Sequence, residues 1–154
     1  MDTVHKYRIR ASSTTLRSGT VATDAVPEPI RFSAPPEFLG ESGVWTPEDF
    51  FVASVVSCYV STFSGMSDLS KLSFVSLEVE AEGILEKEPD GWRFVAMTLR
   101  PDLKIANERD RERAHRLLEK AEHGCLVARS ITAKVTLEPS VSVAAEPVIS
   151  APVA

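Results

Sequence analysis

The sequence predicts an α+β fold in which helices pack on an antiparallel β-sheet. The expected elements follow the order strands, helix, hairpin, helix, strand, which is typical of that class. The length of 154 residues fits one domain. Hydrophobic residues make up 44% of the chain and charged residues 25%, as in ordinary soluble globular proteins.

The N-terminal third predicts two short strands followed by an irregular segment. Apolar and polar residues alternate over residues 5–11, which indicates a strand. Residues 12–19 resemble a turn, and residues 20–24 are expected to return as a second strand. Prolines and glycines then crowd residues 27–45, which favours either a loop or an irregular edge strand.

A long helix is expected to begin at Thr46. Thr46 is a good N-cap, Pro47 suits the first helical position, and Thr46 with Asp49 forms a capping-box pattern. Residues 50–66 are apolar apart from small hydroxyl residues and carry no charge. Such a helix must be buried on most sides. A partner subunit is therefore expected to supply part of its cover.

A hairpin and a second helix follow. Residues 75–82 alternate as a half-buried strand, and Glu88–Gly91 forms the turn into a returning strand over residues 92–99. Asn107 is the expected cap of the second helix, and Gly124 its end. Its core-facing residues recur at helical spacing: Ala114, Leu117, Leu118 and Ala121.

A last strand is predicted over residues 131–138. From Pro139 onward, Pro, Ala, Val and Ser dominate without helical periodicity. We therefore expect one domain over residues 1–138 and a tail over residues 139–154, loosely held or lying against a partner.

The charge and the N-terminus limit the possible functions. A net charge of −5 disfavours nucleic-acid binding and gives no reason to expect attachment to an anionic membrane. No uninterrupted apolar run approaches the ~18 residues of a spanning helix, and the first residues show no apolar signal region. A cytoplasmic, reducing location is therefore expected, in which a structural disulfide is disfavoured.

The two cysteines, Cys58 and Cys125, allow two interpretations. They can be small core hydrophobes, or a redox pair of a reactive and a resolving thiol. A reactive thiol needs a nearby cation, for which Arg17 and Arg31 are candidates, while Arg129 follows close after Cys125. The three histidines match no zinc-ligand spacing, so neither metal nor cofactor is expected.

Several segments together resemble the OsmC/Ohr proteins of organic hydroperoxide resistance. They are residues 35–41, residues 45–50, Ser57–Cys58 and residues 121–127, and the order of elements matches over about residues 4–138. The resemblance implies an intertwined, cytoplasmic homodimer that acts as a thiol peroxidase on organic hydroperoxides. Cys58 would be the peroxidatic cysteine and Cys125 its resolving partner, with the disulfide reduced by a dithiol such as a lipoyl protein.

The resemblance also assigns Glu48, which would hold an arginine against the thiolate. In one branch of the family that arginine precedes the helix, and the matching position lies near Glu37, which is not basic. Arg17 matches the placement in the other branch, so Arg17 is the first candidate and Arg31 the second.

Glu48 and Cys58 are ten residues apart, about 15 Å along one helix and roughly 80° apart in direction. They can hardly share one hydrogen-bond network within a subunit. Our hypothesis is that Glu48 of one chain serves or borders the site of the other, which requires the dimer. Three aromatic residues, Phe38, Phe51 and Phe63, would favour alkyl or fatty hydroperoxides over hydrogen peroxide.

An alternative function stays open. The chain could be a dimer of this family with altered or lost peroxidase activity that binds a small apolar ligand at the dimer interface. A thiol-based redox sensor is disfavoured, because the chain has no nucleic-acid face and no obvious output surface.

Overall fold

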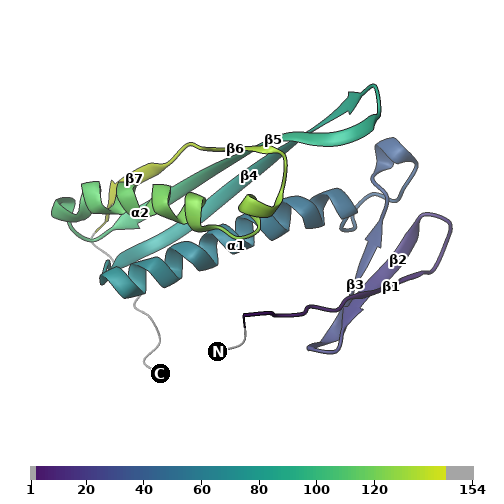
Figure 1. Cartoon of the computed structure of the whole chain (residues 1–154), viewed down its shortest axis with the longest axis horizontal. Helices are drawn as coiled ribbons and strands as arrows, with labels where there is room; N and C mark the ends of the chain where they lie inside the picture. The colour runs from purple at the N-terminus through teal and green to yellow at the C-terminus, as the bar shows by residue number, and fades with distance from the viewer. Residues whose placement is uncertain (1–2, 145–154) are drawn as a thin grey trace. The chain divides into compact units, whose positions relative to one another are not determined.

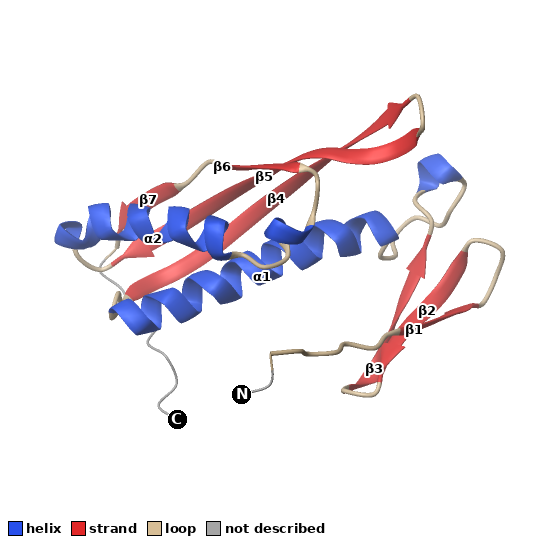
Figure 2. Ribbon diagram, in the orientation of Figure 1, coloured by secondary structure: helices blue, strands red, loops and turns tan. Residues whose placement is uncertain are grey.

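The computed structural model describes residues 3–144, and the chain divides into two compact units, Met1–Phe51 and Val52–Ala154. The long helix α1 (Pro47–Ser70) begins in the first unit and continues through the second. Figures 1 and 2 show the elements of each unit.

The first unit contains a three-stranded antiparallel sheet in the order β1-β2-β3. Its elements are β1 (Arg10–Ser13), β2 (Ser18–Thr23), β3 (Val26–Ser33) and the short helix η1 (Pro36–Phe38). The prediction of a strand over residues 5–11 is wrong for most of its length. Arg10 pairs with Ala22 near the end of β2, so earlier residues extend past their only neighbouring strand.

The proline-rich segment forms the edge strand that was one of its two predicted alternatives. β3 contains Pro27 and Pro29, and β2 is the one strand that it pairs with among the described residues, apart from a bridge between Phe32 and Trp45. Proline cannot donate a backbone hydrogen bond, and an edge strand tolerates this because one of its sides needs no donors.

The capping box at the start of α1 is confirmed. The backbone N–H of Asp49 donates to Thr46 Oγ1 at 3.0 Å, and the backbone N–H of Thr46 donates to Asp49 Oδ2 at 2.9 Å. These bonds satisfy donors that a helix start leaves without partners. The helix then runs to Ser70, four residues beyond the uncharged apolar run that ends at Met66.

The second unit contains a long hairpin and a helical crossover. Its remaining elements are β4 (Phe74–Glu88), β5 (Gly91–Ile105), η2 (Glu108–Asp110), α2 (Arg111–Gly124), η3 (Ala128–Ser130), β6 (Lys134–Leu137) and β7 (Ser140–Val143). β4 and β5 pair antiparallel, whereas β6 and β7 both run parallel to β5. The predicted α+β fold is confirmed. The sheet of this unit is mixed rather than wholly antiparallel, because α2 carries the chain back to the end from which β5 starts.

The predicted tail begins too early. Ser140–Val143 form β7, which pairs with Asp102–Ile105. Pro139 separates β6 from β7 and lacks the N–H that a continuous strand would need there. Residues 145–154 lie outside the described part of the chain.

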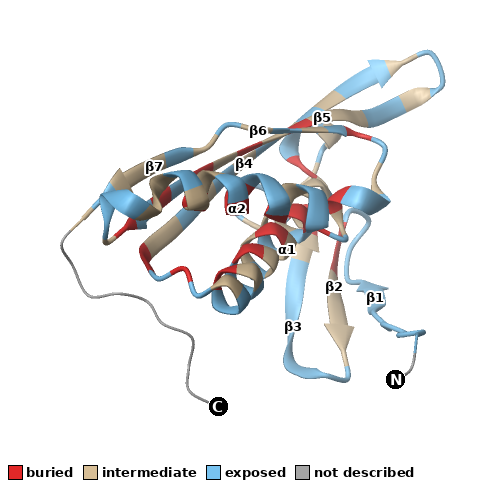
Figure 3. Cartoon of the chain, turned by 60° about the vertical axis from the view of Figure 1, so that its left-hand side comes forward, coloured by how far each residue is buried: buried red, intermediate tan, exposed pale blue. Residues whose placement is uncertain are grey.

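The core of the second unit lies between its sheet and both helices. Alternate residues of β5 from Met97 to Ile105 are buried, so one face of the sheet carries the core (Figure 3). α1 buries every fourth residue toward this core: Val55, Tyr59, Phe63 and Ser67. α2 buries the four residues that the sequence predicts. The phenol of Tyr59 ties the two helices together by donating to the Leu118 carbonyl at 3.1 Å.

α1 is more apolar than its burial within a single chain would require. By length and hydropathy alone this helix could cross a membrane, a test that the core helices of soluble proteins also pass. Only 22% of its most apolar 18-residue stretch is buried in the single chain.

Candidate functional site

The two cysteines lie together in the second unit. Cys58 sits halfway along α1 and is partly exposed, whereas Cys125 directly follows α2 and is fully buried. The two side chains are neighbours, since each shifts the pKa of the other as a hydrogen-bond partner. The structure thus brings together two thiols that are 67 positions apart in the sequence.

The turn after α2 supplies backbone donors to both sulfurs. α2 ends at Gly124, and the chain turns through Leu126 and Val127 into η3. The backbone amides of Val127 and Leu126 face Cys58, and those of Ala128 and Val127 face Cys125. Amides at the start of a helical turn have no partner within the turn, so they are available to a thiolate.

Their surroundings shift the pKa values of the two thiols in opposite directions. Partial burial acts to raise the pKa of Cys58, but hydrogen bonds from Val127, Cys125, Thr62 and Leu126 more than offset it and leave the pKa lowered. Deeper burial and the neighbouring Cys58 raise the pKa of Cys125. Cys125 Sγ also lies 3.8 Å from the Val55 carbonyl oxygen, so its one proton has two possible acceptors, that carbonyl and Cys58. Cys58 is therefore the thiol that loses its proton first as the pH rises.

Arg31 has a charged partner within the first unit. Its guanidinium forms an ion pair with Glu41, which also accepts a hydrogen bond from Ser18 at 2.6 Å. The Ser18 hydroxyl and Arg31 together lower the pKa of Glu41. This network occupies the second candidate for a thiolate partner.

Arg17 and Glu48 both belong to the first unit and retain free polar atoms. The side chain of Arg17 is exposed and makes no ion pair within residues 3–144. Glu48 lies in the first turn of α1, and its Oε2 is buried without a hydrogen-bond partner among the described residues. A buried carboxylate oxygen is costly unless a donor satisfies it.

The three predicted substrate contacts differ in exposure. Phe38 in η1 and Phe51 in α1 are half-buried. Phe63 has no exposed surface and packs edge-on against Phe74, with ring centroids 5.5 Å apart. This burial argues against the predicted contact of Phe63 with substrate and makes it a core residue of this chain.

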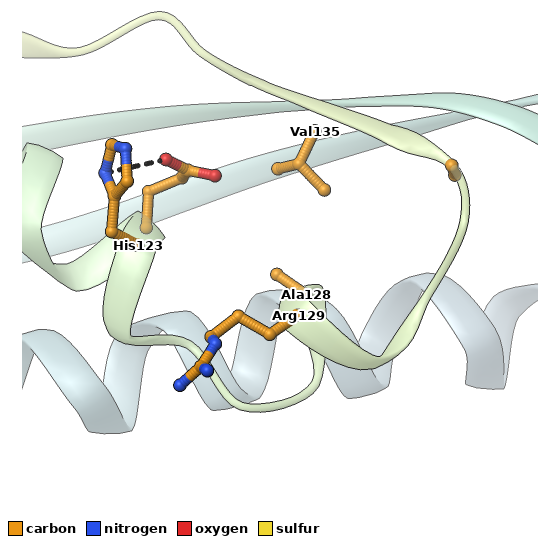
Figure 4. A pocket seen from close by; sticks show the side chains of 6 residues that line it. His123, Ala128, Arg129 and Val135 are labelled. Atoms are coloured by element: carbon orange, nitrogen blue, oxygen red, sulfur yellow. Dashed lines mark ion pairs between the residues drawn. The ribbon is translucent and has the colours of Figure 1, made fainter.

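A hollow of about 350 Å³ lies beside the end of α2, but its lining includes neither thiol (Figure 4). It is lined by Glu122, His123, Ala128, Arg129, Ala133 and Val135. The exposed Arg129, which the sequence places close after Cys125, belongs to this hollow, and its backbone N–H donates to the Cys125 carbonyl. Within the described part of the chain, no cluster of three or more metal-binding side chains occurs.

Sequence reasoning missed three members of the site. Val127 and Leu126 contribute through backbone amides, and Thr62 lies with its Oγ1 3.9 Å from Cys58 Sγ. A signal for the first two was the expected end of the second helix at Gly124, because the residues that follow it leave the helical hydrogen-bond pattern. The signal for Thr62 was its spacing of four residues from Cys58, which places both on one helix face.

Comparisons with known proteins identify the family and the fold of this chain. A family model described as OsmC-like protein matches residues 40–140. The uncharacterized protein YmaD of Bacillus subtilis is 28% identical over 132 residues, covering 84% of this chain and 83% of the relative. The organic hydroperoxide resistance protein-like 1 of Staphylococcus saprophyticus is 25% identical over 137 residues, covering 89% and 96%.

Solved structures show the same fold. An OsmC-like protein of unknown function from Vibrio cholerae superposes with a TM-score of 0.80 at 21% identity, covering 88% of this chain and 99% of that one. The matched range of the family model holds both helices and both cysteines. The chain therefore belongs to the OsmC-like protein family, as the resemblance in its sequence predicts.

Proposed function

We propose that the protein is a thiol-dependent peroxidase that reduces organic hydroperoxides through Cys58, with Cys125 as the resolving thiol. One observation carries the proposal: the two sulfurs lie together, with the pKa of the partly exposed thiol lowered and that of the buried thiol raised. This asymmetry supplies a nucleophile and a proton-bearing partner side by side. The similarity to a protein named for organic hydroperoxide resistance supports the same chemistry.

The proposed reaction uses Cys58 as a thiolate and Cys125 as a protonated thiol. The Cys58 thiolate attacks one peroxide oxygen, the O–O bond breaks, and the alkoxide leaves and takes up a proton to become an alcohol. Cys58 is then a sulfenic acid. The Cys125 sulfur attacks it, a disulfide forms and water leaves. A dithiol reductant, such as a lipoyl protein, restores both thiols by disulfide exchange.

Arg17 and Glu48 are the proposed charge pair of the site. A guanidinium beside Cys58 would hold the thiolate and stabilise charge that develops on the peroxide oxygens. The buried, unpartnered Oε2 of Glu48 is suited to hold that guanidinium in place. Arg17 is preferred over Arg31 because Arg31 is already paired with Glu41.

The proposed unit of function is a homodimer. Helix geometry separates Glu48 from Cys58 by about 15 Å along α1. Glu48 of the partner subunit would therefore serve the thiols of this chain. The low burial of α1 supports the dimer, since only 22% of its most apolar stretch is buried by its own chain. The half-buried Phe38 and Phe51 would favour alkyl hydroperoxides, and the reducing cytoplasm would keep the thiols ready.

Steady-state turnover with cumene hydroperoxide and dihydrolipoamide tests the proposal. We expect turnover by the intact protein, much lower turnover with hydrogen peroxide, and none for Cys58→Ser. Ser57→Ala is the matched control, because Ser57 is exposed and its hydroxyl donates to the Ala53 carbonyl. Turnover that survives in Cys58→Ser would overturn the proposal. Unreactive thiols in the intact protein would instead favour a dimer that binds a small apolar ligand.

A further inference from the structure

The hydroxyl groups of α1 divide into two kinds. Several serines return their hydroxyl protons to carbonyls of the helix itself: Ser57, Ser61, Ser64 and Ser70. The Thr62 hydroxyl differs, since within residues 3–144 its hydrogen-bond contact is Cys58 Sγ at 3.9 Å. Its proton is therefore not committed to the backbone of α1.

The surroundings hold Thr62 next to the sulfur. Cys58 and Thr62 are one helical turn apart on the same face of α1, and both are half-buried. A Cβ added at Gly124 would lie 3.5 Å from Thr62 Cγ2, so the end of α2 packs against the methyl of this threonine. The methyl of Thr62 thus faces the end of α2, and its hydroxyl faces Cys58.

We infer that Thr62 is a positioning residue for Cys58, whose hydroxyl donates a hydrogen bond to the thiolate and holds the sulfur toward the turn after α2. The inference rests on the proposed function in one respect, namely that the reaction at Cys58 is peroxide reduction.

The direction of the effect follows from hydrogen-bond chemistry. In the protonated state, either the thiol or the hydroxyl can be the donor. Once Cys58 has lost its proton, only Thr62 can donate, and a bond to an ionised acceptor is stronger than a neutral one. The hydroxyl therefore favours the thiolate over the thiol. Like the amide of Val127, it lowers the pKa of Cys58, whereas partial burial raises that pKa.

The test is the pH dependence of Cys58 alkylation by iodoacetamide, followed by mass spectrometry of the peptide that contains Cys58. Thr62→Val removes the hydroxyl and keeps the branched shape. We expect it to raise the apparent pKa of Cys58 by roughly one, which lowers alkylation about tenfold at pH values below that pKa. Thr62→Ser keeps a hydroxyl and is expected to restore the profile.

Ser61→Ala is the matched control. Ser61 is exposed, and its hydroxyl donates to the Cys58 carbonyl at 3.1 Å, so this variant removes a neighbouring hydroxyl without touching the sulfur. We expect its alkylation profile to match that of the intact protein. If Thr62→Val does not fold, Thr62→Ala, which adds no atoms, takes its place.

Consumption of cumene hydroperoxide by the same variants separates this inference from the proposed function. An unchanged pH profile in the folded variant that lacks the hydroxyl would overturn the role of Thr62, while peroxide turnover by the intact protein would leave the proposed function standing. A shifted profile in a protein that never consumes peroxide would support the role of Thr62 and refute the peroxidase.

Discussion

The close approach of α2 to α1 at Gly124 positions Cys125, and a side chain at this glycine tests that relation. A Cβ at position 124 would lie 2.7 Å from Met66 Cε and 3.5 Å from Thr62 Cγ2. Gly124→Ala and Gly124→Val place increasing volume at this one contact. The backbone of Gly124 is helical, so neither substitution demands a forbidden backbone conformation.

The two variants differ in the expected change in the free energy of unfolding. For alanine, the Met66 methyl is the free end of a flexible side chain and can rotate away. Overpacking should therefore lower the free energy of unfolding by only about 1 kcal/mol. A gain of up to about 1 kcal/mol from replacing a helical glycine offsets it, so the free energy of unfolding should change little. Valine adds two further carbons, which reach toward the less mobile Thr62. Its cost should approach about 2–3 kcal/mol, or a fall in Tm of roughly 4–10 °C.

Urea unfolding at a fixed protomer concentration measures these costs, because association would make stability depend on concentration. The rate of disulfide formation after one equivalent of cumene hydroperoxide reports on the site. We expect Gly124→Ala to match the intact protein in both measurements and Gly124→Val to be less stable and slower. A Gly124→Val protein with unchanged stability and rate would refute the argument that this contact positions Cys125.

Three further outcomes follow from the contacts of the second unit and from the arginines. Tyr59→Phe removes the hydrogen bond to the Leu118 carbonyl and should cost about 1 kcal/mol in urea unfolding; no loss of stability would contradict that role. Because the pKa of Cys58 is lowered and that of Cys125 raised, alkylation of Cys58 should reach half its maximal rate at a lower pH than alkylation of Cys125. The reverse order would be inconsistent with the two environments. Arg17→Ala should slow cumene hydroperoxide reduction by about 10²-fold or more, whereas Arg31→Ala should leave turnover near normal because Arg31 pairs with Glu41; equal losses would remove the reason for preferring Arg17.

Local patterns in the sequence predicted the elements whose causes are local. The capping box of Thr46 and Asp49 joins residues three apart, so the start of α1 was visible in the sequence. The buried face of α2 and the turn before Gly91 rest on equally short spacings. The pairing of β6 and β7 with β5 was not predicted, because the direction of the returning strand depends on the crossover through α2.

The candidate site divides in the same way. The residue types and the family resemblance indicated Cys58 and Cys125, yet nothing local shows that these sulfurs meet. The amides of Leu126 and Val127 escaped notice because any residue can supply a backbone donor. The engagement of Arg31 by Glu41 was equally invisible, since it depends on how the segment after η1 folds back onto β3.

A thiol count by mass spectrometry, before and after one equivalent of cumene hydroperoxide, tests the central claim most directly. The peroxidase account predicts the loss of two hydrogen atoms, mapped to a disulfide that joins the peptides of Cys58 and Cys125, because the two sulfurs already face each other. Two untouched thiols would contradict it and would mean that the chain keeps the fold of its family without the chemistry.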